Sequence, residues 1–130
     1  MAGILFRAHE SRAQKVRGML KVHEQNRRIF VERTIHTCVD SIYADAEETA
    51  LNSGGKALKF DLESFLNNIG REKITMIMDE LKLKGKLTRE EKETINQSII
   101  QLLQDNGFSA KPVTHHGTRF LIDVDWCLAE

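Results

Sequence analysis

The sequence predicts a mainly helical α+β chain, with a long N-terminal helix, three short-to-medium helices and a C-terminal β-hairpin. Three observations support this class. Residues 6–51 contain no proline and only one glycine, Gly18. Three later segments repeat apolar residues every three or four positions, and the last segment, 120–126, alternates apolar with polar residues. The first spacing is typical of amphipathic helices and the alternation is typical of strands.

The first helix is expected from about Phe6 to Leu51. Its second half repeats apolar residues in one stripe: Val31, Ile35, Cys38, Val39, Ile42 and Ala46. Such a stripe is the side of a helix that packs against another element. The first half has a thinner stripe among many cations: Val16, Met19, Leu20, His23 and Phe30. Because a small domain cannot bury a helix of this length, we expect the first half to project and pair with another chain, or to be partly frayed when alone.

Charge is balanced overall but uneven along the chain. The 19 basic and 19 acidic side chains cancel, so no global field attracts nucleic acid or a membrane. Residues 1–33 hold eight Lys or Arg and three acids, whereas residues 34–55 hold four acids and no Lys or Arg. This asymmetry suits head-to-tail association or one basic contact surface, and a solvated helix face explains it equally well. The predicted basic patch consists of Arg7, Arg12, Lys15, Arg17, Lys21, Arg27 and Arg28.

The glycines at positions 54 and 55 predict a linker, which divides the chain into an association segment, 1–53, and a compact module, 54–130. The module should begin with helices over 62–69, capped by Asp61, and over 72–83.

The third helix of the module is expected over 89–106. Thr88 and Glu91 have the spacing of a capping box, and Gly107 suits the left-handed position after the helix. A hairpin should follow, pairing 108–114 with 118–126 around His115-His116-Gly117. Pro112 cannot donate to a ladder, so the first strand should lie at an edge.

No residue pattern supports an enzyme, a metal or a cofactor. His115 and His116 are neighbours and point in different directions, and the other three histidines lie 13 or more residues apart. Asp123 and Asp125 share a strand face, which alternation on a solvent-facing strand explains. The sequence therefore predicts no catalytic, cofactor-binding or metal-binding residues.

The two cysteines, Cys38 and Cys127, are interpreted as reduced thiols, with a disulfide as the less favoured alternative. No apolar run is long enough for a signal peptide or a membrane span. We therefore expect a cytoplasmic protein without a membrane partner.

Nucleic-acid binding is the main alternative. Three helices followed by a hairpin is also the order of a winged helix-turn-helix, whose third helix enters the major groove. Here that helix would expose more acids than cations, which gives little counterion release. A nucleic acid is thus not the favoured partner, although the basic N-terminal helix could bind phosphates without sequence preference.

The segment 99–108, which ends in Asn-Gly-Phe, and the segment 120–126, which ends in Trp126, resemble the C-terminus of many small proteins of tailed bacteriophages. In those proteins a helix ends at an Asn-Gly-aromatic step and a hairpin closes on a tryptophan. The resemblance covers about a quarter of the chain and transfers no functional residues. It implies a virion component or a small phage-encoded protein that contacts the host, located in the virion or the host cytoplasm.

The sequence thus predicts a non-enzymatic structural or interaction protein. Its partner would be a second copy of the chain, another protein, or both. The predicted association surface is the first helix, with Val31, Ile35, Val39 and Ile42 as the apolar anchors and the basic patch as the complement.

Overall fold

The computed structural model describes residues 2–113 and 120–127, and side chains from Ser11 onward. The elements are α1 (Ala2–Ser53), β1 (Ala57–Asp61), α2 (Leu62–Asn67), α3 (Arg71–Glu80), α4 (Arg89–Asp105), β2 (Ser109–Pro112) and β3 (Leu121–Asp125). The predicted class is confirmed, because the chain is mainly helical and carries one small antiparallel sheet.

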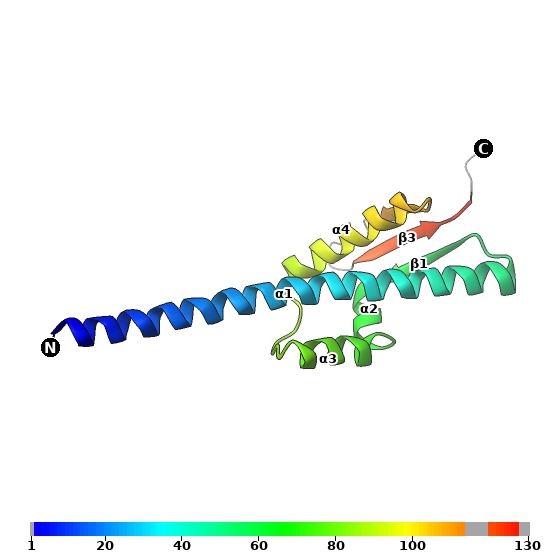
Figure 1. The fold of residues 1–130 in the computed structure, drawn as a ribbon. Coiled ribbons are helices and arrows are strands. Elements are labelled where there is room, and N and C mark those ends of the chain that lie inside the picture. Colours follow the sequence, from blue (N-terminus) through cyan, green and yellow to red (C-terminus); the bar gives the residue numbers. More distant parts are fainter. Residues whose placement is uncertain (1, 114–119, 128–130) are drawn as a thin grey trace.

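Helix α1 is the longest element and determines the shape of the molecule (Figure 1). At 1.5 Å per residue, its 52 residues extend for about 80 Å. The other elements pack only along its C-terminal half, and every side chain from Ser11 to Gln25 is exposed. We call residues 11–25 the arm. The described residues that follow, 26–113 and 120–127, pack together, and we call them the body. The first half of the helix projects, as predicted.

The sheet has three strands in the order β1-β3-β2, all antiparallel. Strand β1 is not predicted by the sequence patterns, and it pairs with β3 from Ala57 opposite Asp125 to Asp61 opposite Leu121. The glycine step before β1 is a tight turn, since Gly54 has a φ of 62° and the Gly55 amide donates to the Thr49 carbonyl over 3.1 Å. The chain therefore folds back directly from α1 into the sheet.

The predicted hairpin forms between β2 and β3, and its turn at His115-His116-Gly117 lies outside the described residues. Pro112 is in β2, which is an edge strand as expected. Asp123 faces solvent with Lys59 directly opposite on β1 and Lys111 directly opposite on β2. Such cross-strand pairs of opposite charge favour this register, so Asp123 has a structural explanation.

The predicted helix ends are largely confirmed. Thr88 and Glu91 form the capping box, because the Glu91 amide donates to Thr88 Oγ1 over 3.1 Å and the Thr88 amide donates to Glu91 Oε1 over 2.9 Å. Gly107 has a φ of 89° after α4. The helix predicted over 62–69 is shorter than expected, since α2 ends at Asn67, and Gly70 immediately precedes α3.

One hydrophobic core joins α1, α4 and the sheet. One face of the sheet packs toward the two helices, which lie together in Figure 1. Helices α2 and α3 lie on the opposite side of α1 in that view. The largest fully buried side chains include one from α2 as well: Phe30, Ile42, Leu62, Ile95, Ile99, Leu103, Ile122 and Val124. No helix in the described part of the chain is long and apolar enough to cross a membrane.

Candidate interaction surface

The predicted apolar anchors lie mostly inside the body. The side chains of Ile35, Val39 and Ile42 are 8%, 5% and 0% exposed, and Val31 is half-buried. Helix α4 and the sheet cover them within the same chain. A side chain that is already buried has little apolar surface to give to a partner, so these residues are corrected from interface anchors to core residues.

Most of the uncovered apolar surface in the described part of α1 lies instead on the arm. Val16, Met19, Leu20 and Val22 are 63%, 59%, 56% and 57% exposed. Steps of four and three place Val16, Leu20 and His23 on one line of the helix, with Met19 beside them. We call these four residues, Val16, Met19, Leu20 and His23, the arm stripe. Val22 lies on another side of the helix.

The arm stripe continues the line of residues that faces the core in the body. The next positions along this line, again at steps of four and three, are Arg27, Phe30 and Thr34. Phe30 and Thr34 are both 0% exposed because the body covers them. The same face of one continuous helix is therefore covered in the body and uncovered on the arm.

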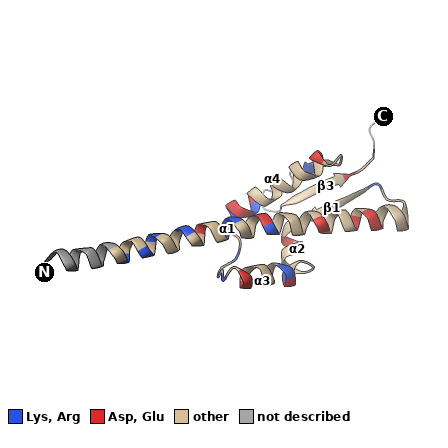
Figure 2. Ribbon diagram, viewed as in Figure 1, with Lys and Arg blue, Asp and Glu red and all other residues tan. Residues whose placement is uncertain are grey.

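Four exposed cations surround the arm stripe. By helical geometry, Lys15 lies on one side of it, Arg17 and Lys21 lie on the other, and Arg12 continues its line four residues before Val16. None of the four forms an ion pair with another described residue. Figure 2 shows these cations along the projecting part of α1. The side chain of Arg7 lies outside the described residues.

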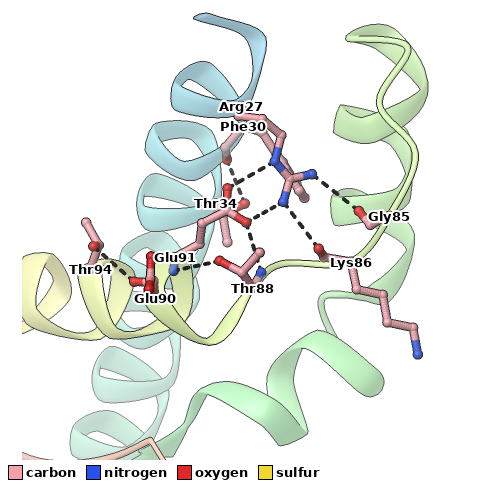
Figure 3. A network of polar contacts seen from close by, with 9 residues as sticks. All are labelled: Arg27, Phe30, Thr34, Gly85, Lys86, Thr88, Glu90, Glu91 and Thr94. Carbon is pink, nitrogen blue, oxygen red and sulfur yellow. Dashed lines mark hydrogen bonds and ion pairs between the residues drawn. The ribbon is translucent and has the colours of Figure 1, made fainter. Parts of the chain in front are cut away.

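Arg28 is exposed at the base of the arm, but Arg27 does not belong to a free basic patch. Its guanidinium turns into the body and binds α4 and the loop before it (Figure 3). Arg27 Nε donates to Glu91 Oε2 over 3.0 Å, and a second nitrogen pairs with Glu91 Oε1. The same group donates to the carbonyls of Gly85 (3.3 Å) and Lys86 (3.2 Å). Arg27 is therefore a structural clamp.

The electrostatics of the clamp agree with its geometry. Burial alone would raise the pKa of Glu91, but the hydrogen bonds from Arg27 and from the Thr88 amide outweigh it and lower the pKa below its ordinary value. The guanidinium also lies over the Phe30 ring, 5.3 Å from its centroid. The base of the arm is thus fixed to the N-terminal end of α4.

Two shallow hollows flank α1. One lies between α1, α2, α3 and the loop before α4, and includes Phe30, Leu66, Ile74, Met78 and Leu87. The other lies between α1 and α4 beside the clamp, and includes Val31, Glu32 and Thr94. Among the described residues, no group of three or more His, Cys, Asp or Glu side chains could hold a metal ion.

Helix α4 would be the recognition helix of a winged helix-turn-helix. Both of its cations lie in ion pairs, Arg89 with Glu93 (3.5 Å) and Lys92 with Glu63 (3.1 Å). Its first turn adds Glu90, which is exposed. A surface with this charge would repel phosphates rather than bind them.

Cys38 is the buried thiol of α1, and burial raises its pKa to about 12. Because the thiolate is the reactive form, Cys38 should not react with a thiol reagent in the native protein at pH 8, whereas the exposed Cys127 should react within minutes. Intact-mass measurement after treatment with iodoacetamide should show one adduct on the native chain and two in urea. Two rapid native adducts would contradict the burial of Cys38.

Comparison with known proteins gives no relative: no family model, no curated protein and no solved structure matches this chain. The resemblance to small proteins of tailed bacteriophages therefore stays a prediction. The uncovered arm and its charges are the features on which a functional proposal can rest.

Proposed function

We propose that this protein is a non-enzymatic structural protein that self-associates through the arm. The observation that carries the proposal is the arm stripe, an apolar line flanked by cations and uncovered by the chain's own body. Charged residues on both sides of an apolar seam are typical of helices that pair with other helices.

The stability of the arm supports the same function. A helix of about 15 residues is marginal in water unless one of its faces packs against something. The body supplies no such packing between Ser11 and Gln25, where every side chain is exposed. A partner on the arm stripe would bury apolar surface and stabilise the helical form of the arm at the same time.

The setting follows from the resemblance to phage proteins. We propose that the assembly is either a virion component or a phage-encoded protein that contacts a host protein in the cytoplasm. In both settings the work is done by surfaces, and the arm is the surface that the fold leaves available.

Replacing Val16 and Leu20 by Asp should disrupt the assembly without unfolding the body. The two changes remove about 3 kcal/mol of apolar burial, which weakens association by more than about a hundredfold. Light scattering after size exclusion should give a mass above 14.9 kDa for the natural chain and a mass near 14.9 kDa for the double variant.

Gln14→Asp is the matched control, because Gln14 is exposed on the side of the arm opposite the stripe. This variant should keep the mass of the natural chain. The proposal fails if the natural chain is a monomer at high micromolar concentration, or if Val16→Asp/Leu20→Asp assembles as well as the natural chain.

The alternative function is nucleic-acid binding by the arm, which its four unpaired cations favour. Fluorescence anisotropy with a labelled duplex over a salt series distinguishes the two functions. Binding through four phosphate contacts would give an affinity that falls steeply with salt. We expect no such binding near 0.15 M salt, and a tight, strongly salt-dependent complex would favour the alternative.

A further inference from the structure

We propose that the arm of one copy docks head to tail on the far half of α1 of a second copy. This inference rests on the proposed function and names the surface that receives the arm. That surface, which we call the acidic face, is formed by the exposed side of α1 between Thr37 and Leu51.

The acidic face carries the charge opposite to that of the arm. Thr37, Ala44 and Leu51 are seven residues apart and therefore form one line along the helix. The first two side chains are small, and the Leu51 side chain is 86% exposed. Exposed acids flank this line: by helical geometry Asp40 and Glu47 lie on one side, and Asp45 and Glu48 on the other.

The charges of the acidic face are uncompensated within the described chain. None of its four acids forms an ion pair with a described residue, and residues 34–55 contain no Lys or Arg. Figure 2 shows the cations on the projecting half of α1 and these acids on its other half. A second copy can therefore supply acids to the arm and cations to the acidic face.

The two surfaces also match in length. At 1.5 Å per residue, the arm cations span about 14 Å and the acids span about 12 Å. The four cations of one copy can therefore lie beside the four acids of another.

The body limits where a helix can dock on this side of α1. Nearer the N-terminus of α1, α3 and the following loop are already attached. Arg33 pairs with Glu80 over 2.6 Å, and Asn26 donates to the Leu81 carbonyl over 3.4 Å. The acidic face lies beyond this attachment, toward the C-terminal end of α1.

Pairing of an arm with another arm is less favourable. It would bring the four cations of one arm beside the four cations of the other, and like charges on facing helices repel. Docking on the acidic face replaces this repulsion by attraction. Because the arm and the acidic face are different surfaces, each copy can bind two others, and the assembly is an open chain or a closed ring.

The test uses two full-length variants that each lack one surface. Asp40→Lys/Asp45→Lys removes the acidic face and keeps the arm, and Val16→Asp/Leu20→Asp removes the arm stripe and keeps the acidic face. Alone, each should be a monomer, with association weakened at least about thirtyfold. Mixed in equal amounts, they should form heterodimers of twice the monomer mass and nothing larger, because only one joint can form.

A charge exchange tests the pairing itself. A chain carrying Arg12→Glu/Arg17→Glu together with Asp40→Lys/Asp45→Lys should recover the assembly that either pair of changes abolishes. Glu72→Lys/Asp79→Lys is the matched control for the reversal of two acids, because both side chains are exposed on α3 and are not part of the acidic face. It should assemble like the natural chain, and circular dichroism should show the same helix content for every variant.

The outcomes separate this inference from the proposed function. If Asp40→Lys/Asp45→Lys assembles normally while Val16→Asp/Leu20→Asp is a monomer, the arm associates but not on the acidic face, and the inference is overturned alone. If the mixture stays monomeric or the charge exchange fails to recover the assembly, the inference is also overturned. If the natural chain is itself a monomer, both proposals fall.

Discussion

Ile35→Asp is expected to unfold the protein rather than release it from an assembly. Ile35 is 8% exposed and belongs to the core that joins α1 to α4 and the sheet. The change removes the packing of a large aliphatic side chain, which costs about 2 to 5 kcal/mol, and buries a carboxylate without a partner, which costs more. Together these effects approach the whole stability of a typical domain, about 5 to 15 kcal/mol.

Circular dichroism and urea unfolding measure the effect directly. Ile35→Val should remain folded and lose only about 1 kcal/mol, which separates the loss of one methylene-sized group from the burial of a charge. Leu20→Asp, a carboxylate on the same helix but on the exposed arm, should leave the urea midpoint nearly unchanged. If Ile35→Asp is instead a folded monomer, Ile35 belongs to an interface between copies and not to the core of one chain.

Local sequence patterns were sufficient to predict most of the helices and the hairpin. The capping box at Thr88 and the left-handed glycine at Gly107 depend on residues within a few positions of one another, and both are confirmed. The projection of the first half of α1 was predictable for a similar reason, since its composition is too polar for a small core.

Long-range partners account for what the sequence did not predict. Strand β1 has only five residues, and it becomes a strand because β3, more than 60 positions later, supplies its ladder. The stripe around Ile35 indicates a side of the helix that packs against another element, but a stripe does not say whether its cover comes from the same chain or another. Helix α4, about 60 positions later, gives the answer.

Arg27 shows the same limitation for a charge. In the sequence it is one of several clustered cations, whereas its partners lie 58 to 64 positions away. The arm stripe, by contrast, was present in the sequence as the thinner first half of the apolar pattern. The denser half around Ile35 was predicted as the association surface, whereas the densest stripe of a helix is more often covered by its own chain.

The Arg27–Glu91 clamp should be the largest polar contribution to stability. Arg27→Met is expected to cost about 2 to 3 kcal/mol, because it leaves the half-buried Glu91 carboxylate and the carbonyls of Gly85 and Lys86 without their donor. Arg28→Met is the matched control, one position along and exposed, and should change stability by less than about 0.5 kcal/mol. Urea unfolding at pH 7 measures both variants.

The effect of Arg27→Met should also depend on pH in a defined direction. The folded protein holds the pKa of Glu91 below its ordinary value of 4.5, so the carboxylate stabilises the fold at pH values above 4.5. This stabilisation is lost as the pH falls through the lowered pKa, where the folded state also takes up the proton. The difference in the free energy of unfolding between the natural chain and Arg27→Met should therefore be largest near pH 7 and shrink below pH 4.5.

The control uses Glu91→Gln as the background, because its side chain has no proton to take up. In this background Arg27→Met should have a smaller effect on the free energy of unfolding, and the effect should not change between pH 7 and pH 4. An equal effect of Arg27→Met in both backgrounds at pH 7 would show that the two side chains do not act together.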